Sequence, residues 1–168
     1  MRALFVYLRG LTLFVAGIVV GTALISPGLA QQPNNGLRLN HVGIAVKDFQ
    51  ESLNFYTKVM GFKAAYAMPS PDGKPTTTFL QINRDTFIEM APATANLPAG
   101  LTHIGILTDD ANGTVTQLRG ASATLQDPRS GGATGSRLSN VMDPNGIRLE
   151  IVEQPTGSLM RKAMESWK

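Results

Sequence analysis

Cysteine is absent from this 168-residue chain, and histidine occurs only twice, at His41 and His103. Without cysteine the protein has no disulfide framework, no thiol nucleophile, no lipoprotein cysteine and no thiolate ligand for zinc. Any metal site must therefore be built from histidine and carboxylate side chains. If both histidines are ligands, no third imidazole remains for acid–base work.

A strong excess of charge is also lacking. The formal net charge is +3, and residues 31–168 carry 13 basic and 12 acidic side chains once Arg2 and Arg9 are set aside. No run of Lys and Arg with interleaved aromatic residues occurs, so nucleic acid is excluded as the expected partner. The length and the 43% hydrophobic content fit one domain with an ordinary core.

The N-terminal segment has the layout of a secretory signal peptide. After two early arginines, Leu11–Ile25 is apolar, and Gly28–Ala30 is a small-x-small cleavage site. A permanent membrane anchor is the competing interpretation, because the apolar stretch is long enough to span a bilayer. Pro27 and the small residues after it favour cleavage. We expect a signal peptide over residues 1–30, a linker over residues 31–36, and an exported protein, periplasmic or secreted, with no permanent membrane anchor.

After the linker the chain repeats itself at an offset of 62 residues. Leu39–Ile44, which reads LNHVGI, matches Leu101–Ile106, which reads LTHIGI. Near the end of each copy a glutamate lies within an apolar run, Glu89 in the first and Glu150 in the second. The spacing from histidine to glutamate is 48 residues in one copy and 47 in the other. Such constancy is hard to explain by chance and indicates two equivalent modules.

Each module is predicted to fold as a strand, a helix and three strands, over residues 37–98 and 99–154. Asp48, with Glu51 three residues later, is typical of a helix start. The turn Asp143–Gly146, which reads DPNG, separates the last two strands. The expected strands cover residues 39–46, 62–67, 77–82, 86–91, 101–107, 123–126, 137–141 and 147–153, and the expected helices cover residues 49–60 and 111–119.

The last residues, 155–168, are predicted to form a C-terminal helix or tail. Leu159, Ala163 and Trp167 recur at helical spacing in this segment. We expect them to pack on the body of the protein or on a second subunit rather than to act as a lid over a substrate.

Strand alternation places the histidines and glutamates on one side of the sheet. Each histidine shares its face with a glycine two residues later, which leaves room for a cavity, while the β-branched residues of the other face should pack on the helices. A glutamate within a strand must find a partner or leave the interior. Two histidines and two glutamates at equivalent positions can satisfy one another through a shared cation. The predicted ligands of one divalent metal ion are His41, Glu89, His103 and Glu150.

This pattern resembles the vicinal oxygen chelate superfamily, that of glyoxalase I and its relatives. The resemblance covers about residues 37–153, and it rests on His41–Ile44, Phe55–Phe62, Glu89, His103–Gly105, and Asp143–Gly146 with Glu150. It implies an α+β fold in which two βαβββ modules form an open, cupped mixed sheet. It also implies that the four predicted ligands take the four ligand positions of the family.

The ligand set is compatible with several metals and with one kind of chemistry. Two imidazoles and two carboxylates suit Zn, Ni, Co, Mn or Fe, and leave room for two cis waters in a six-coordinate site. The resemblance implies that the two open positions chelate adjacent oxygens of a small-molecule substrate and that the metal stabilises an enediolate. A ligand carboxylate then moves the proton, with Glu150 our first choice for the base and Glu89 our second. The predicted activity is that of a metal-dependent lyase or isomerase.

The resemblance does not extend to the glutathione site of glyoxalase I. Bacterial members carry an arginine four residues after the first histidine ligand and an asparagine four residues after the first glutamate ligand, and Ala45 and Ala93 stand at these positions here. We therefore do not expect glutathione dependence. Arg148 and Arg137 are candidates for binding an anionic substrate, and the alternative is that both are solvated at strand ends.

Two other functions stay open at this level. An Fe²⁺-dependent extradiol-type dioxygenase is one, although such relatives generally add a further histidine as acid–base, which this chain lacks. A binding protein of the same fold without turnover is the other. The sequence also leaves open whether one chain builds the site or two chains exchange modules in a homodimer.

Overall fold

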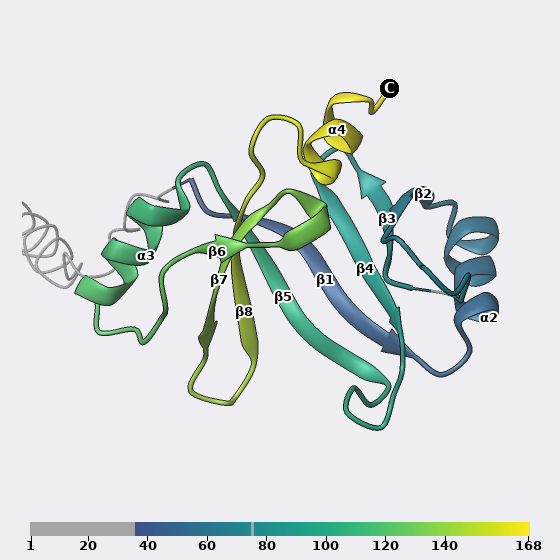
Figure 1. Ribbon diagram of the computed structural model, residues 1–168, viewed down its shortest axis with the longest axis horizontal. Coiled ribbons are helices and arrows are strands. Elements are labelled where there is room, and N and C mark those ends of the chain that lie inside the picture. The colour runs from purple at the N-terminus through teal and green to yellow at the C-terminus, as the bar shows by residue number, and fades with distance from the viewer. Residues whose placement is uncertain (1–35, 75) are drawn as a thin grey trace, which may run out of the picture. The chain divides into compact units, whose positions relative to one another are not determined.

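The fold is built on one eight-stranded sheet. The computed structural model describes residues 36–74 and 76–168, and its strands lie in the order β2-β3-β4-β1-β5-β8-β7-β6 (Figure 1). The predicted signal peptide and residues 31–35 of the linker lie outside the described residues. The strands are β1 (Arg38–Val46), β2 (Lys63–Ala67), β3 (Thr78–Asn83), β4 (Thr86–Pro92), β5 (Gly100–Thr108), β6 (Arg129–Ser130), β7 (Arg137–Met142) and β8 (Arg148–Glu153).

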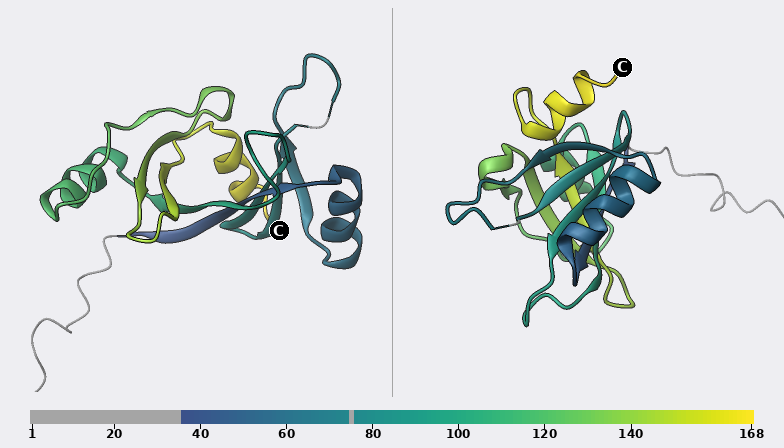
Figure 2. Two further views of the ribbon diagram at one scale, coloured as in Figure 1. Left: turned by 90° about the horizontal axis from the view of Figure 1, so that it is seen from below. Right: turned by 90° about the vertical axis from the view of Figure 1, so that its right-hand side faces the viewer.

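The strand order reproduces the repeat seen in the sequence. β1 runs parallel to β4 in the first module, and β5 runs parallel to β8 in the second. The modules join in the middle of the sheet, where β1 and β5 pair antiparallel. The sheet curves around the space in front of these two strands without closing (Figure 2). The predicted fold class, two βαβββ modules in an open cupped sheet, is therefore confirmed.

The helices begin where the sequence predicts. Asp48 caps α2 (Phe49–Asn54) by accepting a hydrogen bond from the main-chain N–H of Glu51 at 2.8 Å, and a π-helical turn, Phe55–Val59, continues this helix. Asp110 caps α3 (Ala111–Gly120) in the same way. Both carboxylates satisfy N–H groups that a helix start leaves without partners. None of the described helices has the length and apolar character that crossing a membrane requires.

The strand predicted over residues 123–126 does not form, and the two-residue β6 takes the sheet edge instead. Side chains occupy the main-chain oxygens that a strand would use. Arg119 donates to the oxygen of Leu125 at 2.8 and 3.0 Å, and Ser139 Oγ donates to the oxygen of Gln126 at 2.7 Å. The segment is thus held beside β7 by side-chain contacts rather than by a ladder of main-chain hydrogen bonds.

The C-terminal helix packs on the body of the protein, as expected, but with a different face. Its helix, α4 (Leu159–Glu165), buries Met160, Ala163 and Met164. Because α4 ends at Glu165, Trp167 lies beyond the predicted helical stripe and is exposed. The buried face forms one hydrophobic cluster with residues from β3, β4 and β5, namely Phe79, Phe87 and Leu107. α4 therefore fills one end of the concave face of the sheet.

Candidate metal centre

The two repeated histidines meet at the centre of the cup. His41 on β1 lies opposite Gly105, and His103 on β5 lies opposite Gly43. A methyl group added to Gly105 would overlap the imidazole of His41, and one added to Gly43 would overlap that of His103. The two Nε2 atoms lie 2.9 Å apart, and both rings are buried. Each glycine therefore makes room for the histidine of the other module.

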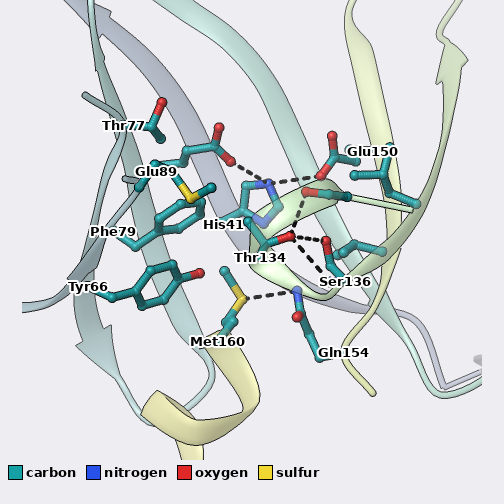
Figure 3. A pocket seen from close by; sticks show the side chains of 14 residues that line it. His41, Tyr66, Thr77, Phe79, Glu89, Thr134, Ser136, Glu150, Gln154 and Met160 are labelled. Atoms are coloured by element: carbon teal, nitrogen blue, oxygen red, sulfur yellow. Dashed lines mark hydrogen bonds and ion pairs between the residues drawn. The ribbon is translucent and has the colours of Figure 1, made fainter. Parts of the chain in front are cut away.

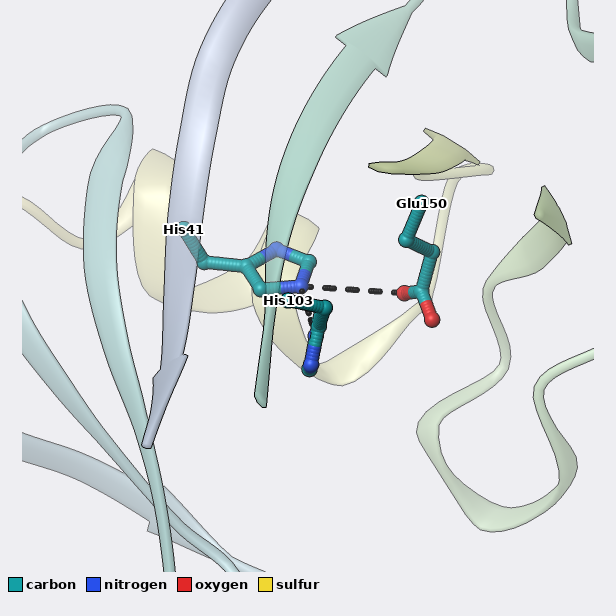
Figure 4. Close-up of side chains that lie close together, drawn as sticks. All are labelled: His41, His103 and Glu150. Atoms are coloured by element: carbon teal, nitrogen blue, oxygen red, sulfur yellow. Dashed lines mark hydrogen bonds and ion pairs between the residues drawn. The ribbon is translucent and has the colours of Figure 1, made fainter. Parts of the chain in front are cut away.

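The two predicted glutamates reach the same place from the flanking strands. On β4, Glu89 Oε2 lies 3.5 Å from Nε2 of each histidine. On β8, Glu150 Oε1 lies 3.7 Å from Nε2 of His41. Ligand atoms of His41, His103 and Glu150 all lie within 4.8 Å of one another (Figure 4). One chain thus brings together all four residues predicted as ligands.

This arrangement suits a single divalent ion. Bonds of about 2.0–2.2 Å to nitrogen and oxygen place neighbouring donor atoms about 3 Å apart and opposite ones about 4 Å apart. The separations to His41 are 2.9 Å from Nε2 of His103 and 3.7 Å from Oε1 of Glu150, and the ligand atoms of these three residues all lie within 4.8 Å of one another. Two imidazoles with two carboxylates are also a donor set that first-row divalent metals accept. The residues present therefore fit the metal that the sequence predicts.

Asn40 sets the direction of the His41 ring. Its side chain is buried, and its Nδ2 donates to the main-chain oxygen of Asp85 at 3.0 Å. That contact leaves Asn40 Oδ1 to accept the proton on Nδ1 of His41, at 3.0 Å. With its proton on Nδ1, His41 presents the lone pair of Nε2 to the centre. A hydrogen bond behind the ring commonly orients metal-binding histidines in this way.

His103 has two partners behind its ring. Thr102 Oγ1 lies 2.9 Å from Nδ1, and Arg148 Nη2 lies 2.8 Å from the same atom. A guanidinium can only donate, so Nδ1 accepts here and the proton sits on Nε2. Binding an ion through Nε2 requires the other tautomer, and Thr102 Oγ1 is placed to accept the Nδ1 proton. Arg148 therefore competes with an ion for His103.

Burial gives the site groups different proton affinities. It lowers the pKa of His41 to about 4, so this imidazole is neutral at pH 7. Burial also raises the pKa of Glu150, and the charge of Glu89 acts in the same direction. At Glu89 burial is outweighed by the hydrogen bond with His103, the two nearby imidazoles and Arg148, so the pKa of Glu89 is lowered. Of the two carboxylates, Glu150 is thus the better proton acceptor.

The low pKa of His41 predicts a pH dependence of stability in protein stripped of metal. In the unfolded chain the pKa of a histidine is near 6.5, whereas in the folded protein that of His41 is about 4. As pH falls below about 6.5, the unfolded state takes up a proton that the folded state does not. The free energy of unfolding should therefore fall, by about 2 kcal/mol from this group between pH 7 and pH 5.

Urea unfolding of the chelator-treated protein at pH 7 and pH 5 measures this loss. His41→Asn keeps a polar side chain but cannot titrate, so its unfolding free energy should fall by about 2 kcal/mol less than that of the wild type over the same range. Equal losses for the two proteins would contradict the prediction.

A cavity of about 230 Å³ opens in front of three of the four residues, His41, Glu89 and Glu150 (Figure 3). Tyr66 of β2 and Phe79 of β3 form one wall, and Ser136 and Gln154, from the segments flanking β7 and β8, line the opposite side. Met160 of α4 lines the end. Because His41, Glu89 and Glu150 also line this cavity, a substrate seated in it would touch the candidate metal centre.

The two arginines predicted to bind substrate lie in different places. Arg148 reaches His103 from the concave side of β8. Arg137 donates to Glu153 Oε2 at 3.3 Å and to Asn112 Oδ1 at 2.9 Å, and it does not line the cavity. Its neighbours in sequence, Ser136 and Leu138, do line it, so strand alternation turns Arg137 away. This geometry does not support a substrate-binding role for Arg137.

Sequence reasoning missed Asn40 and Thr102, the residues behind the two imidazoles. A signal was present, because a polar residue precedes the histidine in both copies of the repeat. Strict strand alternation places neighbouring residues on opposite faces, so it predicts that these polar residues lie away from the histidines. The β1–β5 register shifts between Leu39 and His41, and at this irregularity Asn40 contacts the adjacent ring. No sequence pattern identified Tyr66, Gln154 or Met160 as residues that line the cavity.

Comparison with known proteins agrees with this architecture. A model of the Glyoxalase/Bleomycin resistance protein/Dioxygenase superfamily matches residues 38–151. Lactoylglutathione lyase from Escherichia coli O157:H7 is 30% identical over 128 residues, covering 70% of this chain and 93% of that relative.

Two solved structures share the fold. Methylmalonyl-CoA epimerase from Mycobacterium tuberculosis superposes with a TM-score of 0.62 at 21% identity, over 75% of this chain and 94% of that one. A variant of the Streptomyces coelicolor methylmalonyl-CoA epimerase superposes with a TM-score of 0.60 at 23% identity, over 72% and 96%. The family resemblance indicated by the motifs is confirmed: the chain belongs to the Glyoxalase/Bleomycin resistance protein/Dioxygenase superfamily.

Proposed function

We propose that the protein is a metal-dependent lyase or isomerase that moves a proton on a small substrate with two adjacent oxygens, through an enediolate. One observation carries the proposal. Two histidines and two glutamates from corresponding strands of the two modules converge on one point at the wall of a cavity. When bound, a divalent ion would supply a Lewis acid that stabilises negative charge on the substrate oxygens.

The contacts of the carboxylates suggest different roles for them. Glu89 approaches both imidazoles and is placed to hold an ion together with His41 and His103. Glu150 Oε1 lies farther away, 3.7 Å from Nε2 of His41 and within 4.8 Å of the ligand atom of His103, and Glu150 lines the cavity from the opposite wall. We therefore assign Glu150 as the base. Its carboxylate takes a proton from the carbon beside the substrate carbonyl and returns it to the neighbouring carbon, so the reaction consumes no co-reactant.

Glutathione dependence is not part of the proposal. Ala45 is buried on β1, and Ala93 follows β4, so neither position offers a partner for the carboxylates of glutathione. The lactoylglutathione lyase relative is similar in sequence, but a shared family and fold do not by themselves determine which substrate a protein uses.

Metal analysis and isotope exchange test the proposal together. Protein purified without chelator is expected to carry one divalent ion per chain. After loading with Zn, Ni, Co, Mn or Fe in turn, at least one form should exchange deuterium from D₂O into the carbon beside the carbonyl of a hydroxyketone, as followed by NMR. A protein that takes up no divalent ion would overturn the proposal and favour a binding protein without turnover. Oxygen uptake with a catechol and ferrous iron would instead favour a dioxygenase.

Export from the cytoplasm stays a prediction. If residues 1–30 are a signal peptide, the exported form begins at Gln31, and intact-mass measurement of that form should show the corresponding loss. A full-length chain retained in the membrane would contradict it.

A further inference from the structure

The far end of the cavity, away from the candidate metal centre, is closed by α4. Met160 lines this end, while its helix packs on Phe79 and Phe87 through one hydrophobic cluster. The ring of Tyr66 stacks on Phe79, with centroids 4.5 Å apart and planes 17° apart. The cavity measures about 230 Å³, below the range of roughly 300–1,000 Å³ that is usual for drug-sized ligands. Its enclosed part therefore suits a small compound.

Two polar groups that line this space, on Tyr66 and Gln154, have unused hydrogen-bonding capacity. The hydroxyl of Tyr66 points into the cavity (Figure 3), and among the described residues it has no hydrogen-bond partner. Burial raises the pKa of Tyr66, so the hydroxyl keeps its proton and can donate. Across the cavity, Gln154 Nε2 contacts only the weakly accepting sulfur of Met160, at 3.4 Å. Both groups can therefore bind a hydroxyl of a ligand.

In the described part of the chain, the cavity is lined by acidic but not by basic side chains. The carboxyl groups of Glu89 and Glu150 line the cavity, and among the described residues no Lys or Arg lines it. Neither Arg148, which lies beside Nδ1 of His103, nor Arg137, which pairs with Glu153, lines the cavity. Away from the ion, an anionic group on a substrate would meet no partner and would be desolvated at a net cost.

We propose that this cavity selects a small neutral hydroxylated carbonyl compound, such as a hydroxyketone or short sugar, with Tyr66 binding a hydroxyl distant from the chelated oxygens. The inference rests on the proposed function for the position of the chelated end. It adds a specificity-determining residue, Tyr66, and an end wall, α4, to the site.

Calorimetric titration of metal-loaded protein with three probes tests the inference without requiring turnover. Dihydroxyacetone carries the chelating pair and a distant hydroxyl, hydroxyacetone lacks that hydroxyl, and dihydroxyacetone phosphate adds charge at the same end. Wild-type protein should bind dihydroxyacetone at least tenfold more tightly than the phosphate. Tyr66→Phe should weaken binding of dihydroxyacetone about five- to tenfold, the usual effect of one neutral hydrogen bond, and leave hydroxyacetone within about twofold.

Tyr56→Phe is the matched control, because Tyr56 also stacks on a phenylalanine, Phe62, but lies outside the cavity. It should change neither affinity. Metal content is measured on the same samples. If the protein holds no metal, the proposed function fails. If it holds metal but binds the phosphate as tightly as dihydroxyacetone, binds neither, or shows no effect of Tyr66→Phe, the inference alone is overturned.

Discussion

Replacing Glu150 with glutamine is expected to lower the proton-transfer rate by about a thousandfold, within the range of roughly 10²–10⁴ that general bases contribute. The change is isosteric, so the cavity wall keeps its shape. An amide cannot accept the substrate proton at neutral pH. Among the described residues that line the cavity, Glu89 is the one other carboxylate beside His41. Glu89 Oε2 lies 3.5 Å from Nε2 of both imidazoles, where it is placed to hold the ion, and its lowered pKa makes it the weaker base.

Deuterium exchange on metal-loaded protein measures this loss, with bound metal determined in parallel. Glu153→Gln is a suitable control because Glu153 lies on the same strand but faces away from the cavity. Its carboxylate accepts from the main-chain N–H of Ala111 at 3.0 Å, and a glutamine oxygen can still do so. Exchange at the wild-type rate in Glu150→Gln would refute the assignment of the base. Loss of the metal from this variant would show that Glu150 chiefly holds the ion.

Replacing Gly105 with alanine is expected to weaken metal binding by at least about a hundredfold, beyond what loss of a hydrogen bond behind a ligand usually produces. The new methyl group would overlap the His41 ring, which is buried and cannot swing aside within the sheet. Either the ring leaves the centre or the β1–β5 pairing shifts, and in both cases a ligand is displaced. Gly43→Ala should do the same to His103.

Competition with a chromophoric chelator gives the metal affinities, and thermal melting shows whether each variant is folded. Gly120→Ala serves as the control, because a methyl group at that position in α3 has open space around it and the backbone there is ordinary. It should bind metal as the wild type does. A folded Gly105→Ala protein with unchanged metal affinity would show that the close packing of glycine against histidine is not needed for the site.

The four candidate ligands and the lining of the cavity come from different parts of the structure. The ligands come from the two central strands and their parallel neighbours. The cavity comes from the flanking strands, the segment before β7 and α4, where this chain places Tyr66, Gln154 and Met160. Substrate preference can therefore change through these residues while the four candidate ligands stay in place.

The sequence by itself determined the two-module fold, the helix starts and the four candidate ligands. These features are local or repeated: a cap acts within one turn, alternation acts between neighbours, and the copies His41–Glu89 and His103–Glu150 reinforce each other. The absence of cysteine restricted the strong side-chain ligands to imidazoles and carboxylates.

Only the tertiary structure decided which groups face one another across strands. The pairing of each glycine with the histidine of the other module, the contact of Asn40 with His41, and the turning of Arg137 away from the cavity depend on register and on strand irregularities. The buried face of α4 depends on where the chain returns to the sheet after β8. Such contacts join residues far apart along the chain, and local periodicity carries no information about them because register is set by the packing of the whole sheet.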